Sequence, residues 1–548
     1  MAQNANDSLL KSVRSLFKIL RLDKKDISSI YFFAILGGLI ALTLPLGIQT
    51  IINFVTAGTL STSIVVLIII VVLGVFINGL VQVRQMQITE KVKQKIFTRY
   101  SLEFANKLPH LNIEKLDKYY LPELVNRYFD APSLTKSLEK ILLDVPAAII
   151  QIVFGLILLS FYHPIFIGFG LFLIVILVII VKYTSPQGLA TSLKASDYKY
   201  AIASWLEEMA RVIKSFKYSK DTDLHLKKAD KLVSGYLDAR TSHFKILLTQ
   251  YWSLITFKII ITAAMLIVGS YLVIDNQINV GQFIAADIVI IAIMNSVEKL
   301  ISSLDKVYDT LTSIQKLSKV IDSDIETSGT RELEALNKGV TIDFLDVNFS
   351  YDTKQVLKNL SFKIQSGQLI CLSGASGSGK SSVLRLLTGA FTNFTGTILI
   401  DNAPIGNYSL KSLRSQTGIL LSQQDIFNGT LLENLTMGSA EISIDEVNKL
   451  SDRLNLKDFI KTYKDGYDAV LDTQGKKINA NIRQEILLVR ALLGKHRLLL
   501  LENPFNNLEP KEVVALMDYL QNENAATIII ISDDENVKSK CDIVINLK

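Results

Sequence analysis

The chain has 548 residues, which is too long for one hydrophobic core and predicts two or more domains. Hydrophobic residues make up 49% of it and charged residues 20%, a mixture that indicates membrane spans joined to a water-soluble part. The formal net charge is only +6 and no basic tract is interleaved with aromatic residues, so we expect no nucleic-acid partner.

The first 26 residues are polar and mixed in charge. The first long apolar run begins near Ile27, so this beginning of the chain does not have the pattern of a signal peptide. Residues 1–27 are also too few to form an N-terminal protease domain. We expect them to be a cytoplasmic tail.

Residues 28–320 are expected to form a helical transmembrane domain. Six apolar segments in this region are long enough to cross a bilayer, and a buried helix bundle is the alternative for any one of them. The first segment contains Pro45 and is expected to bend there. The six segments lie at about 28–54, 63–83, 145–162, 164–181, 252–274 and 281–297.

The connections between these segments alternate in charge. Those at 55–62, 162–164 and 275–280 are short and nearly uncharged, whereas those at about 84–144 and 182–251 are long and rich in Lys and Arg. Cytoplasmic loops of membrane proteins carry an excess of Lys and Arg. The pattern predicts that the tail, both long connections and the C-terminal half face the cytoplasm.

The two long connections are expected to be helical and to continue the spans beyond the bilayer. We interpret Leu121–Phe129 and Ala201–Glu208 as transverse helices that dock on a cytoplasmic domain; ordinary solvated helix faces are the alternative. Exposed Phe129 and Trp205 would be costly in water, which favours docking.

Two charged residues fall inside expected spans. Lys258 is close enough to the cytoplasmic end of its span to extend its ammonium group to the membrane surface. Asp287 is deeper, and it either lines a substrate path or pairs with another helix.

The C-terminal part changes in pattern. Residues 321–339 are polar and then loose, and we assign them as a linker. From residue 340, short apolar strands and then alternating strands and helices predict an α/β nucleotide-binding domain over 340–548.

A phosphate-binding motif follows the expected strand Gln368–Leu372. The residues 374–381 fit G-x-x-x-x-G-K-[ST], whose glycines let backbone N–H groups surround a phosphate, and a helix pattern follows. Lys380 is expected to reach the β- and γ-phosphates, and Ser381 to ligate Mg²⁺. A chance Gly/Ser loop is the alternative, and the strand–loop–helix context disfavours it. The expected phosphate-binding residues are Gly374, Ala375, Ser376, Gly377, Ser378, Gly379, Lys380, Ser381 and Ser382.

The cysteines and histidines indicate no further site. Cys371 and Cys541 lie in or beside apolar, strand-like runs, so we expect reduced thiols rather than a disulfide or a metal site. The five histidines are scattered without metal-ligand spacing.

With six spans, two long cytoplasmic connections and a C-terminal P-loop domain, the chain resembles a half-transporter of the ATP-binding cassette (ABC) exporter family. The resemblance covers nearly the whole chain. It implies a six-span, exporter-type helical domain fused to an α/β P-loop domain. Within the family, Leu44–Asn53 and Asn279–Ala286 look most like transporters for toxin secretion and bacteriocin export.

The resemblance also assigns nucleotide contacts upstream and downstream of the P-loop. Tyr351 matches the aromatic residue that stacks on adenine. The segment Ser422–Thr430 matches the glutamine loop, in which Gln423 is the preferred contact to Mg²⁺ and water and Gln424 the alternative.

Several positions depart from the family pattern. Where the family has Asp-Glu-Pro after a strand, this chain has Glu502-Asn503-Pro504. Glu502 replaces the Asp on the Mg²⁺ side, and Asn503 replaces the Glu that polarises the attacking water. Asn cannot accept a proton at neutral pH, and general-base help is typically worth about 10²–10⁴-fold. The family's switch histidine falls at Asp533, whose negative charge has the wrong sign beside a γ-phosphate.

The signature motif is altered as well. The family's L-S-G-G-Q becomes Ile478–Ile482, which has lost the hydroxyl and both glycines that let a helix N-terminus approach the γ-phosphate of the opposite subunit. Asn479 can still donate a hydrogen bond. Glu509 takes the place of the Asp in the D-loop.

From these residues we expect an integral, multi-pass membrane protein of a bacterial inner membrane, with its nucleotide-binding domain in the cytoplasm. The resemblance implies ATP and Mg²⁺ as cofactors, held on the metal side by Ser381, Gln423 and Glu502. Asn503 and Asp533 occupy the catalytic positions in degenerate form. A second half-transporter is expected as partner, and the need for a periplasmic adaptor stays open. The competing hypothesis is a non-transporting, ATP-binding regulator or scaffold; a soluble P-loop enzyme is excluded by the spans.

Overall fold

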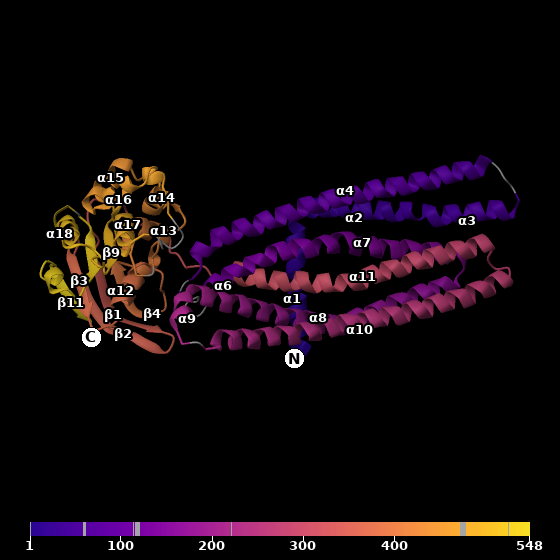
Figure 1. The fold of residues 1–548 in the computed structure, drawn as a ribbon, viewed down its shortest axis with the longest axis horizontal. Coiled ribbons are helices and arrows are strands. Elements are labelled where there is room, and N and C mark those ends of the chain that lie inside the picture. The colour runs from indigo at the N-terminus through magenta and orange to yellow at the C-terminus, as the bar shows by residue number, and fades with distance from the viewer. Residues whose placement is uncertain are drawn as a thin grey trace. The chain divides into compact units, whose positions relative to one another are not determined.

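The computed structural model of the protein describes residues 2–58, 62–112, 114, 121–220, 222–422, 424–471, 478–523 and 525–547 (Figure 1). The chain divides into two compact units. Unit 1 comprises Met1–Leu111 and Leu116–Asp324, and unit 2 comprises Asn112–Lys115 and Ile325–Lys548. Each unit is considered by itself below.

In its described residues, unit 1 consists of helices joined by short turns and connections, and six of its helical segments are long and apolar enough to cross a membrane. Many large apolar side chains on them face outward; Ile267, for example, is 72% exposed. Such a surface is stable against lipid rather than water. The helices are α1 (Ala2–Leu22), α2 (Lys24–Ala41), α3 (Thr43–Thr56), α4 (Thr62–Lys107), α6 (Leu121–Asn126), α7 (Asp130–Tyr162), α8 (Ile165–Arg211), α9 (Ile213–Tyr218), α10 (Leu224–Ile274) and α11 (Val280–Ile321).

The first span is interrupted, as its proline predicted. α2 ends at Ala41 and α3 begins at Thr43, so the break falls at Leu42. Pro45 has no N–H to donate to the carbonyl of Ala41, and its ring crowds that carbonyl. The Thr43 hydroxyl donates instead to the Ile40 carbonyl at 2.7 Å, which satisfies one acceptor at the break.

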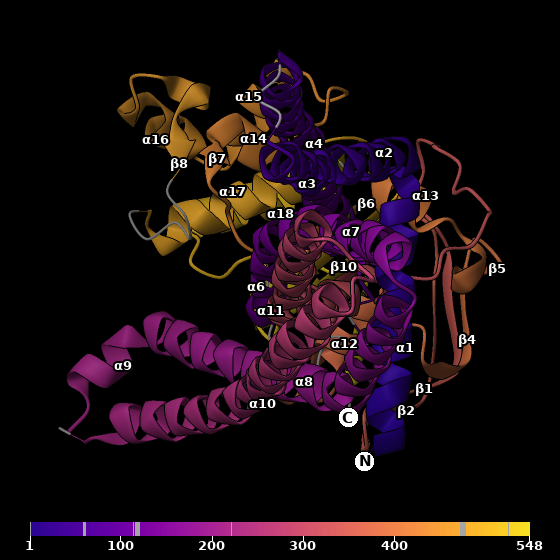
Figure 2. The ribbon, with the colours of Figure 1, turned by 90° about the vertical axis from the view of Figure 1, so that its right-hand side faces the viewer.

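One of the two predictions of a transverse helix is wrong. Ala201–Glu208 belongs to the last turns of α8, which continues without interruption to Arg211. The chain first breaks at Val212, and the short helix α9 then connects α8 to α10 (Figure 2). The other expected segment does form short helices of its own, α6 and the 3₁₀ turn Arg127–Phe129.

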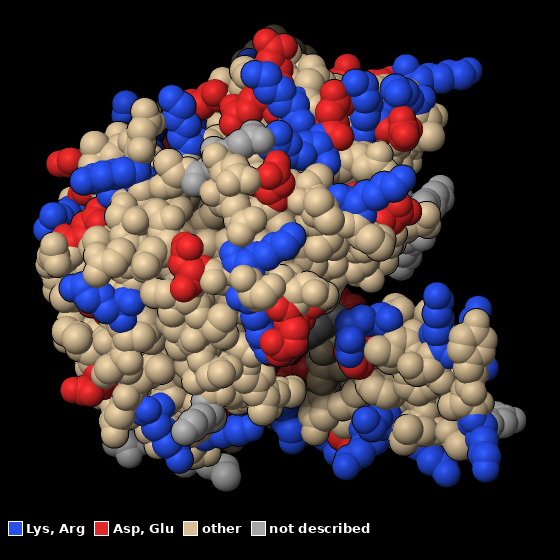
Figure 3. Space-filling model, turned by 90° about the vertical axis from the view of Figure 1, so that its left-hand side faces the viewer, with Lys and Arg blue, Asp and Glu red and all other residues tan. Residues whose placement is uncertain are grey.

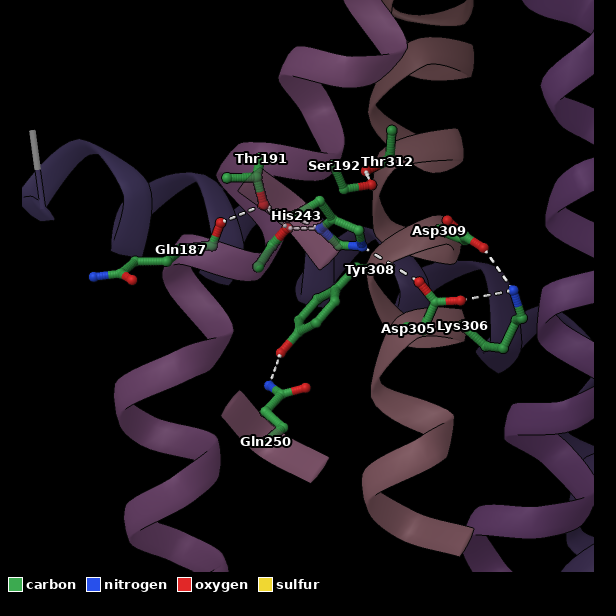
Figure 4. A network of polar contacts seen from close by, with 11 residues as sticks. Gln187, Thr191, Ser192, His243, Gln250, Asp305, Lys306, Tyr308, Asp309 and Thr312 are labelled. Carbon is green, nitrogen blue, oxygen red and sulfur yellow. Dashed lines mark hydrogen bonds and ion pairs between the residues drawn. The ribbon is translucent and has the colours of Figure 1, made fainter. Parts of the chain in front are cut away.

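A buried polar network joins α8, α10 and α11 (Figure 4). His243 on α10 is fully buried; its Nδ1 lies 3.0 Å from the Thr191 hydroxyl and its Nε2 lies 3.3 Å from Asp305 Oδ1. One turn along α11, the Tyr308 hydroxyl accepts a hydrogen bond from Gln250 at 2.9 Å. Polar groups that pair across a helix interface favour one set of meeting faces, because other pairings would leave more of them without partners.

Unit 2 contains a four-stranded antiparallel sheet in the order β2-β1-β4-β5 and a five-stranded parallel sheet in the order β11-β3-β10-β9-β6. The strands are β1 (Ile342–Tyr351), β2 (Lys354–Ile364), β3 (Leu369–Gly374), β4 (Phe394–Ile400), β5 (Ala403–Pro404), β6 (Thr417–Leu420), β9 (Leu498–Glu502), β10 (Thr527–Ile531) and β11 (Ile543–Leu547). A further pair, β7 (Gly429–Thr430) and β8 (Val470–Leu471), is antiparallel.

The parallel sheet is the centre of unit 2. Its strands β9 and β10 are buried along their whole length, which explains their uninterrupted Leu and Ile runs. The helices of unit 2 are α12 (Lys380–Leu387), α13 (Leu410–Ser415), α14 (Leu431–Thr436), α15 (Ile444–Arg453), α16 (Leu456–Thr462), α17 (Ala480–Leu492), α18 (Pro510–Asp518) and α19 (Glu535–Lys538). Because ligands of such folds bind where parallel strands end, the segments after β3, β9 and β10 define the candidate site.

Figure 3 shows Lys and Arg side chains interspersed with Asp and Glu side chains over most of its face, whereas Lys and Arg predominate on the part that projects at the lower right.

Candidate nucleotide-binding site

The P-loop turns sharply between β3 and α12, as the motif predicted. Gly374, Gly377 and Gly379 have φ of +146°, +85° and +94°, a region that favours glycine. A Cβ at Gly374 would lie 2.3 Å from the Leu547 carbonyl oxygen, and a Cβ at Gly379 would lie 2.5 Å from Leu357. The glycines are therefore required both by conformation and by space, and they direct the backbone toward the start of α12.

Lys380 is the first residue of α12, and its ammonium group folds back over the loop. It donates to the Gly374 carbonyl, to the Ala375 carbonyl at 3.3 Å and to Asp533 Oδ2 at 3.3 Å. All three ammonium protons therefore have acceptors within the protein.

Ser381 and Glu502, which the sequence placed on the metal side of the site, come together from different elements. The Ser381 hydroxyl donates to Glu502 Oε1 at 2.5 Å, and Glu502 Oε2 accepts the backbone N–H of Ser422 at 2.9 Å. Glu502 is the last residue of β9 and is 7% exposed. A hydroxyl that donates its proton keeps its oxygen lone pairs free, and hard cations such as Mg²⁺ prefer oxygen ligands.

Asp533 lies just beyond the end of β10 and contacts the P-loop directly. Its Oδ1 accepts from the Ser373 hydroxyl at 3.2 Å and from the Gly374 N–H at 3.4 Å, while Oδ2 pairs with Lys380. Partial burial would raise the pKa of this carboxyl, but the hydrogen bonds from Gly374 and Lys380 outweigh it and lower the pKa. Asp533 is thus a carboxylate at neutral pH. The sequence placed it near the γ-phosphate but did not indicate its pairing with the P-loop lysine.

Asn503 follows Glu502 in a left-handed conformation, with φ of +49°. Asn tolerates this region better than most residues do. Its backbone N–H donates to the Ile531 carbonyl at 3.2 Å and its carbonyl accepts from Gln484 at 3.5 Å. An amide side chain at this exposed position has no basic group that could accept a proton from water.

Tyr351 lies beside α12. Its hydroxyl accepts from Arg385 at 3.2 Å and from the Ser382 hydroxyl at 3.4 Å. Its ring contacts Phe349 and Phe391 edge-on, with centroid distances of 4.8 and 5.8 Å. The phenol is therefore fixed next to the phosphate-binding helix.

The preferred residue of the glutamine loop, Gln423, lies outside the described residues. The alternative, Gln424, turns back on its own loop, where its side-chain oxygen accepts the Leu421 N–H at 3.2 Å. Ser422, directly before Gln423, was not singled out from the sequence, yet its N–H holds Glu502.

The altered signature begins a helix at the expected place. Asn479 is the N-cap residue of α17, and its side chain makes no capping hydrogen bond. On the next turn, Arg483 pairs with Asp425 of the glutamine loop at 3.0 Å. Glu509, at the D-loop position, precedes α18, and its N–H donates to Glu512 at 2.7 Å.

These residues fit the phosphates and the metal of a nucleotide. The glycines form a cradle that a Cβ would fill, and the Ser378 hydroxyl is buried there without a hydrogen-bond partner among the described residues. Ser381 and Glu502 would hold Mg²⁺ on one side of the cradle. Lys380 would neutralise phosphate charge on the other side.

Unit 1 has a cavity of about 280 Å³ at the break in the first span. Its polar lining comes from Thr43, Asn78 and Gln151. Asp287 does not line it, although Ile288 does. Asp287 is half-buried and, within the described part of the chain, makes no hydrogen bond or ion pair.

Lys258, the other charged residue in a span, pairs with Glu298 of α11 at 3.5 Å. The ion pair with a neighbouring helix explains why a lysine is tolerated in an apolar segment. The sequence did not indicate this pairing.

Helical membrane spans followed by a P-loop at the end of a parallel sheet define a membrane protein with a nucleotide-binding domain. Two family models match this chain: the ABC transporter transmembrane region over residues 27–297 and the ABC transporter domain over residues 357–506. The chain belongs to the ABC transporter family. It has one transmembrane region and one cassette, which is the architecture of a half-transporter.

Similar proteins agree with this assignment. The chain is 32% identical over 245 residues to an uncharacterised ABC transporter ATP-binding protein of Bacillus subtilis, covering 44% of this chain and 42% of that protein. It is 27% identical over 323 residues to the alpha-hemolysin translocation ATP-binding protein of Escherichia coli O157:H7, covering 58% of this chain and 45% of that protein. The chain thus spans less than half the length of these two relatives.

The fold matches that of a solved exporter. A bacterial Atm1-family ABC exporter with ATP bound superimposes with a TM-score of 0.86, over 96% of this chain and 93% of that chain. The sequence identity is 19%, so this likeness concerns the fold alone.

Proposed function

We propose that the chain is the subunit of an ATP-dependent exporter that binds MgATP at its P-loop and couples closure of its cassettes to export of a still unidentified substrate. The observation that carries this proposal is the hydrogen bond between Ser381 and Glu502 beside an intact P-loop. The P-loop would supply the phosphate cradle and the two side chains the metal site, at one edge of the parallel sheet. The same chain has six candidate spans.

The working unit is a dimer, because six spans supply half of a pathway and ATP sites of this family form between two cassettes. The second half is either an identical chain or a different half-transporter. The cassette faces the cytoplasm, the spans lie in a bacterial inner membrane, and a periplasmic adaptor would join the complex if the substrate is a secreted toxin. The likeness to the alpha-hemolysin translocation protein supports that substrate class.

A second candidate function is a non-transporting regulator that uses nucleotide binding as a conformational latch. Asn503 and Asp533 favour it, since both catalytic positions lack the group that chemistry requires. Export measured in cells with wild-type chain, with Lys380→Ala and without the chain separates the two. If the chain is a regulator, its deletion leaves export unchanged and alters another membrane complex instead.

Nucleotide binding is tested with the full chain in lipid nanodiscs, by photolabelling with an azido analogue of ATP. Lys380→Ala should reduce labelling about tenfold or more, because the lysine contacts the β- and γ-phosphates. Lys411→Ala removes an exposed cation on α13, outside the residues assigned to the nucleotide site, and should leave labelling unchanged. Equal labelling of wild type and Lys380→Ala would refute the proposal.

A further inference from the structure

Asp533 contacts the P-loop, and it occupies the position that the family resemblance assigns to a residue beside the γ-phosphate. Three donors converge on its carboxylate: the Ser373 hydroxyl, the Gly374 N–H and the Lys380 ammonium group, at 3.2, 3.4 and 3.3 Å. Two of them belong to the phosphate-binding motif itself. The carboxylate thus makes, from within the chain, the kind of contacts that a phosphate oxygen makes with a P-loop.

The contact is specific to this residue rather than a result of burial. The side chain of Asp533 is 63% exposed, whereas that of Lys380 is 13% exposed. An exposed carboxylate is held here by its partners, and a bound anion can displace it. Asp534, the next residue, turns away and caps α19 through Asn536 at 2.8 Å.

We propose that Asp533 makes this P-loop select nucleoside diphosphates over triphosphates by standing in for the γ-phosphate. The inference rests on the proposed nucleotide binding at the same site and adds a specificity-determining residue to it. Where ATP is in large excess the site still fills with ATP, but with an affinity that Asp533 lowers.

The lysine's three protons explain the selection. A diphosphate needs one of these protons as a hydrogen-bond donor to its β-phosphate. Lys380 can provide it by giving up its hydrogen bond to one backbone carbonyl, which leaves the Lys380–Asp533 pair intact. A triphosphate brings a γ-phosphate to the position of Asp533, so two anions then compete for one ammonium group. Either the carboxylate withdraws and loses three donors, or it stays and repels the γ-phosphate.

The test is equilibrium binding of MgADP and of the magnesium complex of the β,γ-imido analogue of ATP to the full chain in nanodiscs. In wild type we expect the dissociation constant of the triphosphate to exceed that of the diphosphate. Asp533→Asn keeps the shape and removes the charge, so the ratio of the two constants should fall about tenfold, almost entirely through tighter triphosphate binding. Glu535→Gln removes an exposed charge two residues away and should leave the ratio unchanged.

The outcomes separate this inference from the proposed function. If wild type and Lys380→Ala bind neither nucleotide, nucleotide binding itself is refuted. If both nucleotides bind but wild type prefers the triphosphate by about tenfold, as a P-loop without an internal anion is expected to do, the role of Asp533 is refuted alone. If the ratio of the two dissociation constants is the same in Asp533→Asn as in wild type, the role of Asp533 is also refuted. If that variant does not fold, the ratio measured for wild type decides whether Asp533 has this role.

Discussion

Glu502 Oε1 accepts the hydroxyl proton of Ser381 at 2.5 Å, across 121 residues of sequence. The family resemblance aligns Glu502 with an Asp. The side chain of Glu502 is longer by one methylene group, and its carboxylate still reaches the serine. The second oxygen is held by Ser422, so the carboxylate is fixed at both ends. A group held in this way would orient the serine oxygen toward a bound metal ion.

Glu502→Gln should weaken divalent-metal binding about 10–100-fold, the usual effect of losing a group that orients a metal ligand. The amide keeps the size of the side chain but removes the charge. Mn²⁺ in place of Mg²⁺ allows binding to the nucleotide-loaded chain to be followed by electron paramagnetic resonance. Glu441→Gln, an exposed residue before α15, serves as the control. Unchanged Mn²⁺ affinity in Glu502→Gln would remove Glu502 from the metal site.

The membrane topology is a prediction from the Lys and Arg distribution, which places residues 55–62 and 275–280 outside the cytoplasm. Single cysteines at Ala57 and Gln277 should react with an impermeant maleimide in intact cells, and a cysteine at Lys217 should react only after lysis. Ala57 is chosen because the neighbouring Gly58 has φ of +69°, where a cysteine would be strained. Labelling of Lys217→Cys in intact cells would reverse the topology.

The sequence predicted those features that depend on local pattern. The spans follow from hydropathy, and the P-loop from glycines that no other residue can replace at Gly374 and Gly379. The bend in the first span follows from Pro45, which breaks a backbone hydrogen bond wherever it occurs in a helix.

The sequence failed where the outcome depends on contacts across the fold. The end of α8 at Arg211 has neither Gly nor Pro, so Ala201–Glu208 could not be distinguished from a separate helix. The Lys380–Asp533 pair joins residues 153 apart, and only the parallel pairing of β3 with β10 brings them together. The ion pair between Lys258 and Glu298 likewise depends on which helices pack together, and local sequence pattern does not specify this.

Glu485 on α17 should make the cassette less stable as pH rises. It is 2% exposed, and one carboxylate oxygen has no hydrogen-bond partner among the described residues. Burial, and then the charges of Glu512 and Glu509, raise the pKa of Glu485 to about 7. The folded state therefore binds this proton more tightly than the unfolded state. The stabilisation is complete at pH values below the ordinary range of Glu and is lost as pH rises toward about 7.

Glu485→Gln stays neutral and should escape this loss. Relative to wild type, it should gain up to about 3 kcal/mol in the free energy of unfolding between pH 4.5 and pH 8, since each pKa unit is worth 1.36 kcal/mol. Hydrogen exchange of peptides from α17, with both proteins measured at each pH, reports this gain. Glu535→Gln, whose side chain is 86% exposed, should follow wild type. A constant difference between Glu485→Gln and wild type across pH would contradict the raised pKa.

The altered catalytic positions limit what any pairing of cassettes can achieve. In this family each ATP lies between the P-loop of one cassette and the signature helix of the other. A homodimer has an intact P-loop at both sites, but Asn503 supplies no base, Asp533 replaces the histidine, and α17 begins with Asn479. With an intact partner, one site lacks the base and the other faces this chain's signature. No arrangement provides one site with every family element.

We therefore predict that the chain hydrolyses ATP slowly with either kind of partner, because losing the base removes about 3–5 kcal/mol of transition-state stabilisation. Asn503→Glu combined with Asp533→His should increase phosphate release in lipid vesicles, by up to about 10²–10⁴-fold if the base alone limits the rate. The increase should be larger when Asn479→Ser, Ala480→Gly, Asn481→Gly and Ile482→Gln are added. Asn503→Gln with Asp533→His is the matched control, since it lengthens the side chain at position 503 without adding a carboxylate there. A wild-type rate of about 1 s⁻¹ or more, within the range of working enzymes, would contradict the prediction and assign proton acceptance to another group, with Glu502 the nearest candidate.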